Sequence, residues 1–113
     1  MKRILLSKSR WTSILETSLK NDGFEVVPVS DKQEAFSEID KGNLDGILMD
    51  LRLRTGEDGI KIVEYALSKI PTILAAVWGN SPVDRIEQKG FKYFYRGGSA
   101  FQPVFTYFKN GNA

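Results

Sequence analysis

Short segments rich in apolar residues recur along the 113-residue chain, with more polar segments between them. They predict five strands, at residues 3–7, 24–30, 45–51, 72–78 and 92–96. The third, DGILMDL, is apolar without interruption between two aspartates, which is typical of a strand buried on both faces in a parallel sheet. Pro28 lacks an amide hydrogen, so the second strand is expected at a sheet edge, or the proline at a strand end.

The segments between these strands have apolar residues every three or four positions, which predicts helices. The predicted helices cover residues 9–23, 31–42, 60–70, 83–90 and 101–110. Ser9 is a candidate N-cap of the first, Ser30 or Asp31 of the second, and Ser81 followed by Pro82 is a typical start for the fourth. The residues expected to face the core from the first, third and fifth helices are Trp11, Ile14, Leu15, Leu19, Ile60, Val63, Leu67, Phe101, Val104, Phe105 and Phe108.

Strands and helices therefore alternate five times along the chain. Such alternation, with strands apolar on both faces, predicts an α/β fold: a five-stranded parallel sheet between two layers of helices. The length suits one domain spanning residues 1–113. In sheets of this kind the functional site lies beyond the carboxyl ends of the strands.

The composition narrows the chemistry of that site. The chain has no cysteine and no histidine, so disulfides, thiolate catalysis and a histidine base are excluded, and a metal would have to be a hard cation held by Asp and Glu. The formal net charge is +2 without blocks of like charge, so nucleic-acid binding is not indicated. No apolar run is long enough for a membrane span or a signal peptide, and a cytoplasmic protein is expected.

The strand ends offer one acid, Asp50, close to several candidate bases. A carboxylate that ends a buried strand is poorly solvated unless it has a partner. Asp50 is therefore either a residue that braces the following loop or helix, or a phosphate acceptor or metal ligand. The bases that follow neighbouring strands are Lys8, Arg10, Arg52 and Arg96.

The segment DGILMDLRLRTGEDGIKIVEY, residues 45–65, resembles the receiver domain of two-component response regulators, which has the flavodoxin-like fold. The segments NDGFEVVPVSD, IPTILAAVWGN and IEQKGFKYFYRGGSAF fit the same pattern, so the resemblance covers essentially the whole chain. It implies a domain for signalling rather than an enzyme. In this family a strand-three Asp accepts a phosphoryl group from a histidine kinase, and an acidic pair after strand one holds Mg²⁺ with it.

Asp50 matches the acceptor, but the other positions of the family depart from the pattern. The acidic pair falls on Leu6 and Ser7, or on Ser7 and Lys8, so both acids are missing. Phe94 matches an aromatic that switches rotamer in the family, and it is equally a typical core residue.

Two further positions of the family contact the phosphoryl oxygens. The Ser or Thr after strand four falls on Ala76, and the Lys after strand five falls on Gly97. Arg96 is one residue earlier and, within a strand, would point to the opposite face. Without the acids and these contacts the charge of a phosphoryl group is not neutralised, so a degenerate receiver is expected, with no cofactor. Mg²⁺ is expected only if Asp50 is an active acceptor.

Two interpretations of the residues around Asp50 stay open at this point. Lys8 or Arg10 pairs with Asp50 and supplies the charge of the missing ion. Alternatively, both bases are solvated and Asp50 accepts hydrogen bonds from backbone amides.

Aromatic residues and arginine are typical of interface centres, and several lie near the end of the chain. Family members dimerise or bind effectors through helix four, strand five and helix five, so a homodimer or a protein partner is expected on this face. Trp78, at the end of the fourth predicted strand, is expected to be exposed, because receivers expose the loop residues there. The candidate interface residues are Arg85, Tyr95, Arg96, Phe101 and Tyr107.

Three functions remain. The first is a regulatory protein-interaction domain with little or no phosphorylation, and the second is a working receiver that a histidine kinase phosphorylates on Asp50. The third is a flavodoxin-like protein that binds a flavin phosphate in the hydroxyl-rich stretch SKSRWTS, residues 7–13, although that stretch lacks the glycine that such loops use.

Overall fold

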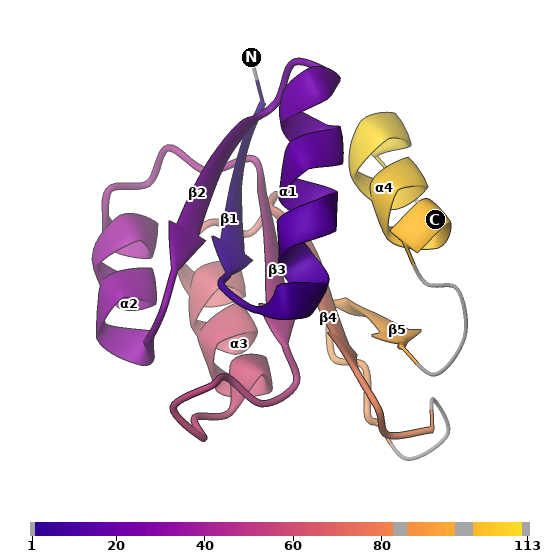
Figure 1. Ribbon diagram of the computed structural model, residues 1–113. Coiled ribbons are helices and arrows are strands. Elements are labelled where there is room, and N and C mark those ends of the chain that lie inside the picture. The colour runs from indigo at the N-terminus through magenta and orange to yellow at the C-terminus, as the bar shows by residue number, and fades with distance from the viewer. Residues whose placement is uncertain (1, 83–85, 97–100, 112–113) are drawn as a thin grey trace.

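The computed structural model describes residues 2–82, 86–96 and 101–111, and it contains one parallel sheet of five strands (Figure 1). The strands are β1 (Arg3–Ser7), β2 (Glu25–Val29), β3 (Gly46–Asp50), β4 (Leu74–Gly79) and β5 (Lys92–Tyr95). The helices are α1 (Arg10–Asn21), α2 (Lys32–Asp40), α3 (Gly59–Lys69) and α4 (Phe101–Asn110). The predicted α/β fold with a five-stranded parallel sheet is confirmed.

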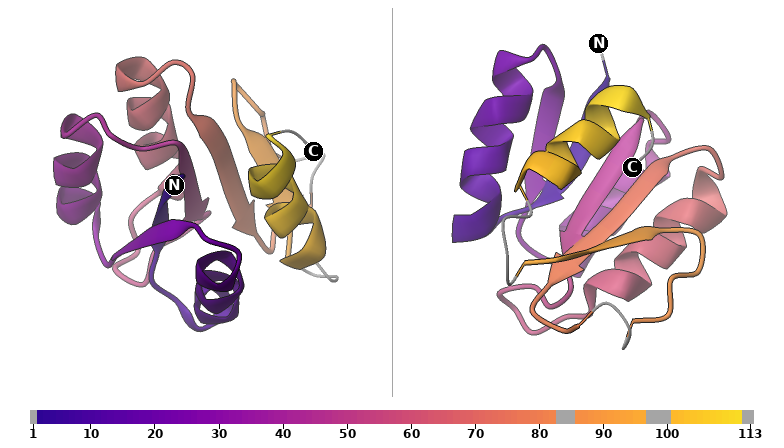
Figure 2. Two further views of the ribbon diagram at one scale, coloured as in Figure 1. Left: turned by 90° about the horizontal axis from the view of Figure 1, so that it is seen from above. Right: turned by 90° about the vertical axis from the view of Figure 1, so that its right-hand side faces the viewer.

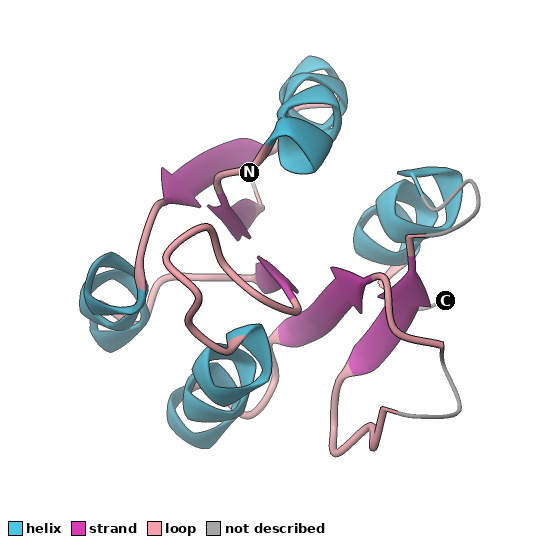
Figure 3. Cartoon of the chain, turned by 60° about the horizontal axis from the view of Figure 1, so that its bottom comes forward, coloured by secondary structure: helices cyan, strands magenta, loops and turns pink. Residues whose placement is uncertain are grey.

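The strand order is β2-β1-β3-β4-β5. The chain adds β2 on one side of β1 and then β3, β4 and β5 on the other side, so the order of addition switches between β1 and β3. The β2 strand, which contains Pro28, lies at one edge, as its sequence predicts. The helices α1 and α4 cover one face of the sheet, and α2 and α3 cover the other (Figures 2 and 3). The carboxyl ends of β1 and β3 are therefore adjacent at the point where the strand order reverses, which is where parallel sheets place their sites.

Both faces of the sheet are apolar, which explains the uninterrupted apolar sequence of β3. Ile47 and Met49 belong to the core beneath α2 and α3, whereas Leu48 belongs to the core beneath α1 and α4. All five residues of β3 are buried. Asp50, at the end of this strand, is thus held by a rigid and dry part of the molecule.

The stripe of α1 that faces the core agrees with the prediction at Leu15 and Leu19 but not at Trp11 and Ile14. Thr12, Leu15 and Leu19 are buried, whereas Trp11 and Ile14 are 42% and 60% exposed. The reason is local: the Thr12 hydroxyl donates to the Ser7 carbonyl oxygen at 2.6 Å and ties this side of the helix to the end of β1. In α3 the core face is likewise shifted, to Ile62, Val63 and Ala66, and the predicted Ile60 and Leu67 lie half-buried at its borders.

The fourth predicted helix, residues 83–90, is wrong over its described part. Residues 83–85 lie outside the described residues, and residues 86–90 form bends and irregular structure. The Gln88 side chain accepts a hydrogen bond from the backbone amide of Tyr93 at 3.0 Å, which binds this segment to β5. Ile86 is its only described apolar contact with the core, and so short a segment has little to stabilise a helix.

Trp78 was expected in an exposed loop, but it lies within β4 and is completely buried. Its ring packs edge-on against Phe101 of α4, with ring centroids 5.4 Å apart. The strand continues to Gly79. The indole of Trp78 packs in the core beneath α4, and this burial keeps the end of the strand in the sheet. None of the helices in the described part of the chain is long and apolar enough to cross a membrane.

Candidate functional site at the carboxyl edge of the sheet

Asp50 lies at the centre of the carboxyl edge and is only 4% exposed. The start of α3 packs directly on its backbone, since a Cβ atom at Gly59 would lie 1.8 Å from the Asp50 carbonyl oxygen. Any residue other than glycine at position 59 would therefore displace the end of β3. The close packing of Gly59 against the Asp50 backbone fixes the position of Asp50.

Ser7, at the end of the adjacent strand β1, forms two hydrogen bonds with Asp50. Its hydroxyl donates to Oδ2 at 2.8 Å and accepts from the Asp50 backbone amide at 2.8 Å. Ser7 is itself buried, so both bonds are shielded from water. The position where the resemblance expects an acid thus carries a hydroxyl that satisfies the carboxylate instead of repelling it.

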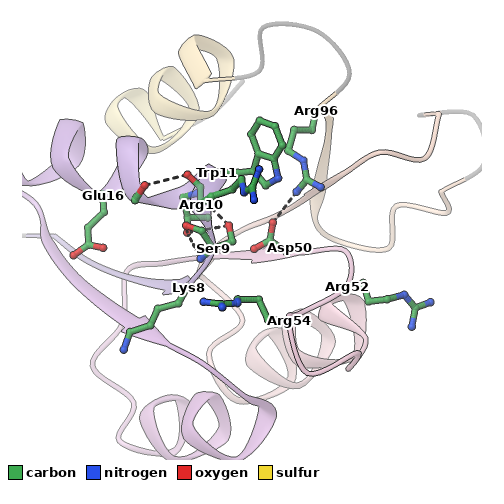
Figure 4. Close-up of a pocket in the computed structure, with 11 residues that line it drawn as sticks. Lys8, Ser9, Arg10, Trp11, Glu16, Asp50, Arg52, Arg54 and Arg96 are labelled. Carbon is green, nitrogen blue, oxygen red and sulfur yellow. Dashed lines mark hydrogen bonds and ion pairs between the residues drawn. The ribbon is translucent and has the colours of Figure 1, made fainter.

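Arg96 forms the ion pair with Asp50, with 2.8 Å between Nη1 and Oδ1 (Figure 4). The side chains are 16% and 6% exposed, so the pair is largely buried. The guanidinium also lies against the rings of Trp11 and Trp78, 5.0 and 6.0 Å from their centroids. Two tryptophans from different elements therefore hold the cation in place.

This pairing corrects two sequence expectations. Among the described residues, neither Lys8 nor Arg10 forms an ion pair with Asp50, and Figure 4 shows Lys8 pointing away from it. Ser7 uses the side of β1 that faces Asp50, so the next residue points elsewhere. Arg96 was placed on the wrong face because strand alternation was extended to it, whereas β5 ends at Tyr95.

The environment of Asp50 raises the pKa of its carboxyl above the ordinary value of 3.8. Burial is the main cause, because it removes water from the charged form. The hydrogen bond from Ser7 and the charge of Arg96 act in the opposite direction and offset part of this effect. The indole N–H of Trp78 is buried beside this site and has no hydrogen-bond partner among the described residues.

The strand register changes the interpretation of β4. Ala76 pairs with Leu48, two residues before the end of β3, and it is completely buried. The residue in register with Asp50 is Trp78, so the nearest side chain of β4 is an indole without a hydroxyl. Phe94 is 7% exposed and packs against Tyr107 with ring centroids 5.8 Å apart, as a core aromatic does. Gly97 lies outside the described residues.

The residues around Asp50 do not fit a magnesium ion. The described part of the chain holds no group of three or more Asp or Glu side chains that could bind a metal. Asp58 caps α3 through the Ile60 amide, and Glu57 accepts from the Lys32 amide and the Thr55 hydroxyl, so both are engaged elsewhere. A hard dication needs several oxygen ligands, whereas each oxygen of Asp50 already has a hydrogen-bond donor.

A cavity of about 740 Å³ opens beside Asp50, between the start of α1 and the loop that follows β3. Sequence reasoning placed Lys8 and Arg10 here, and Trp11 within the stretch 7–13 of the flavin alternative, but it missed Arg54. The available signal was the RLR pattern directly after Asp50, which puts a second arginine in the same loop. The charged residues that line the cavity are Lys8, Arg10, Glu16, Asp50, Arg52, Arg54 and Arg96.

The predicted interface residues have unequal exposure. Tyr95 is 46% exposed at the end of β5. Phe101 and Tyr107 are partly buried against the core, and the Tyr107 hydroxyl donates to the Ala75 carbonyl oxygen at 3.1 Å. Arg85 lies outside the described residues. Of the described candidates on this face, Tyr95 therefore presents the largest free apolar surface.

No protein-family model matches the sequence, and no curated protein is similar enough to match it. Solved structures do match over nearly the whole chain. The response regulator TrrA from Thermotoga maritima, in complex with Mg²⁺ and BeF, has a TM-score of 0.80 and 18% identity, with 97% of this chain and 98% of that chain covered. A response regulator receiver protein from Sinorhizobium medicae has a TM-score of 0.79 and 19% identity, with 96% and 92% covered.

A third similar structure is named an adenylate cyclase, from Rhodopirellula baltica, with a TM-score of 0.78 and 20% identity. The match covers 97% of this chain and 86% of that chain. At these identities the likeness shows a shared fold. The resemblance to receiver domains is thus confirmed as the fold of the chain.

Proposed function

We propose that this chain is a regulatory domain with a receiver fold that acts through protein contacts and does not use Mg²⁺-dependent phosphotransfer. The observation that carries the proposal is the arrangement of Asp50, which is buried between the Ser7 hydroxyl and the Arg96 guanidinium. The acceptor position is retained, but its surroundings are those of a structural ion pair. We propose further that the domain is not an enzyme and acts in the cytoplasm.

Phosphoryl transfer to Asp50 would require a free carboxylate oxygen and a way to neutralise the incoming charge. Arg96 donates to Oδ1 and Ser7 donates to Oδ2, so each oxygen has one lone pair engaged in a buried hydrogen bond and is a weaker nucleophile. Arg96 could stay bound to a phosphoryl group, but without nearby acids the site gains no metal ion to share the charge. Both considerations favour a silent acceptor position.

The test is incubation with acetyl phosphate and Mg²⁺, followed by mass spectrometry of the intact protein. We expect no phosphorylated species, with Asp50→Asn as the control for modification at other sites. The double variant Ser7→Asp with Arg96→Lys supplies an acid beside Asp50 and a smaller cation, and it serves as the matched attempt to restore the reaction. A phosphorylated wild-type protein that Asp50→Asn abolishes would refute the proposal and establish the working-receiver alternative.

Protein contact is proposed on the face formed by β5 and α4, where Tyr95 is exposed. A second copy of the chain or another protein bound there would bury the Tyr95 ring. Buried tyrosines of this kind often contribute much of the binding energy of an interface. Tyr95→Glu should lower self-association or partner binding in analytical ultracentrifugation. Ile14→Glu on α1, where the side chain is 60% exposed, is the matched control. Equal behaviour of both variants and wild type would contradict the proposed face.

The flavin alternative has one observation in its favour: the cavity beside Asp50 is lined by Ser9, Thr12 and Ser13 together with Trp11. However, no glycine lets the backbone approach a phosphate in this loop. We expect the purified protein to be colourless. Flavin absorbance that persists through purification would support this alternative instead.

A further inference from the structure

The cavity beside Asp50 has an excess of positive charge. Five cations and two acids line it, and both acids already have partners. Asp50 is paired with Arg96, and the Glu16 carboxylate lies 2.8 Å from Lys20, one turn further along α1. The positive charges that remain are therefore not balanced from within the cavity.

Four of these cations have no ion-pair partner among residues 2–82, 86–96 and 101–111, and three of the four, Lys8, Arg10 and Arg54, also make no side-chain hydrogen bond there. They come from two segments, the turn between β1 and α1 and the loop after β3, which the fold brings together around the cavity. Figure 4 shows Arg54 extending from its loop toward the side of Lys8. Arg52 points away from Asp50 in the same view, and its Nη1 donates to the Gly56 carbonyl oxygen at 3.0 Å.

Like charges around one cavity repel one another, and an anion bound between them would relieve that repulsion. The volume of about 740 Å³ lies within the range of roughly 300–1,000 Å³ that small-molecule sites occupy. It exceeds what one phosphate group fills, while the three cations are spread over two walls. The backbone amides of Arg10 and Trp11, the first two of α1, also have no acceptor among the described residues.

We propose that this cavity binds a small molecule with two or more adjacent phosphate groups, held by Arg10, Arg54 and Lys8 without a metal ion and without covalent transfer. Asp50 does not oppose this binding, because it is buried and Arg96 neutralises it. The Ser9 hydroxyl lines the same wall and can donate to a phosphate oxygen, whereas the Ser13 hydroxyl already donates to the Arg10 carbonyl oxygen at 3.0 Å. The proposal goes beyond the proposed function and is tested separately from phosphorylation of Asp50.

The experiment is a titration with pyrophosphate in metal-free buffer containing a chelator, followed by calorimetry and by tryptophan fluorescence. Trp11 is the reporter, because it is 42% exposed at the cavity, whereas the only other tryptophan, Trp78, is buried. We expect saturable binding that weakens with added salt. Arg10→Gln with Arg54→Gln should weaken binding by about tenfold or more, the loss of two charge-assisted contacts.

Two variants that each lose one charge act as controls, and combined they match the two charges lost in the test variant. Arg52→Gln changes the neighbouring arginine of the same loop, and Lys61→Gln changes an exposed lysine of α3 that does not line the cavity. Both should bind pyrophosphate nearly as wild type does. All four altered residues, Arg10, Arg52, Arg54 and Lys61, are exposed. The variants should therefore keep the wild-type circular dichroism spectrum and Tm, which are measured alongside.

Further arms identify what the cavity recognises. ADP should bind at least as well as pyrophosphate, and inorganic phosphate should bind more weakly than either. No saturable binding of pyrophosphate and ADP would overturn the proposal, and so would binding that all variants weaken equally. Binding of ADP without pyrophosphate would show recognition of the base, and binding of a single-stranded oligonucleotide alone would show a macromolecular ligand; either would refute recognition of a small polyphosphate.

Discussion

The two ends of the sheet each carry a cluster around one arginine, and the two clusters differ in burial. At the amino end, Arg3 pairs with Glu25 and Glu38 and donates to the Asn43 side chain at 2.8 Å. At the carboxyl end, Asp50 is the one ion-pair partner of Arg96 in the described part of the chain. Glu25 is 50% exposed, whereas the Asp50 side chain is 6% exposed.

The difference concerns what each cluster can do. At the amino end, Arg3 of β1 has partners on β2 and on α2, so the cluster connects these three elements. Because these charges lie closer to water, each contact contributes little to the free energy of unfolding. At the carboxyl end a single buried pair sits beside a basic cavity. Loss of one partner there leaves an uncompensated charge in a dry environment, which is costly. The carboxyl end therefore combines structural dependence on one ion pair with an open, charged surface for ligands.

The largest expected effect is that of Arg96→Met. It removes the cation from a buried carboxylate and should lower the free energy of unfolding at neutral pH by about 3 kcal/mol or more. The measurement is urea denaturation followed by circular dichroism. The double variant Arg96→Met with Asp50→Asn removes both charges and should recover more than half of the loss. A single variant as stable as the wild type would show that the pair does not hold the carboxyl edge together.

The next largest effect is expected for Ser7→Ala. The substitution leaves Oδ2 and the backbone amide of Asp50 without the hydroxyl that satisfies both. Unsatisfied buried groups of this kind should cost about 2 kcal/mol of unfolding free energy. Ser13→Ala is the matched control, because the Ser13 hydroxyl only donates to the Arg10 carbonyl oxygen at an exposed site. Equal stability of the two variants would contradict the central role of Ser7.

The pH dependence of the free energy of unfolding reports on the protonation of Asp50 at the carboxyl end of the sheet. Because burial raises the pKa of Asp50 above 3.8 in the folded protein, the folded state binds this proton more tightly than the unfolded state. The contribution of Asp50 to stability is therefore greatest below pH 3.8 and declines as pH rises through the raised pKa. The difference in urea midpoint between wild type and Asp50→Asn should show this decline between pH 3 and pH 7. A difference that instead grows in favour of the wild type with rising pH would mean a lowered pKa.

The smallest effect is expected at the amino end. Arg3→Met removes contacts to Glu25, Glu38 and Asn43, but these lie near water and exchange easily for hydration. The loss in unfolding free energy should be at most about 1 kcal/mol in the same urea experiment. A loss as large as that of Arg96→Met would erase the distinction between the two ends of the sheet.

Hydrophobic pattern predicted the sheet because the strands are buried on both faces, and burial leaves a local signature. It also indicated Asp50, since an acid at the end of an apolar strand stands out in the sequence. The partner of Asp50 was missed for a physical reason: Arg96 follows the last residue of β5, so the face it uses depends on the turn and not on strand alternation.

The other errors have the same origin in tertiary contacts. Trp11 and Ile14 have the spacing of a core stripe, yet the bond from Thr12 to the Ser7 carbonyl oxygen sets a different face of α1 toward the sheet. Trp78 belongs to β4 because its ring fills the core under α4. The convergence of Lys8, Arg10 and Arg54 on one cavity depends on loops far apart in sequence, and no local pattern reveals it.

If the Arg96–Asp50 pair takes the place of a magnesium site, Mg²⁺ should not bind at the Asp50 carboxylate. A Mg²⁺ titration of the protein measures this binding. Backbone amide shifts of Ser7, Asp50 and Leu51 in ¹H–¹⁵N NMR spectra report on binding at the carboxylate, with Asp50→Asn as the control. The expected result is that these shifts stay unchanged through millimolar Mg²⁺, or change only as they do in the control. Saturable shifts at these three amides that Asp50→Asn abolishes would contradict the claim.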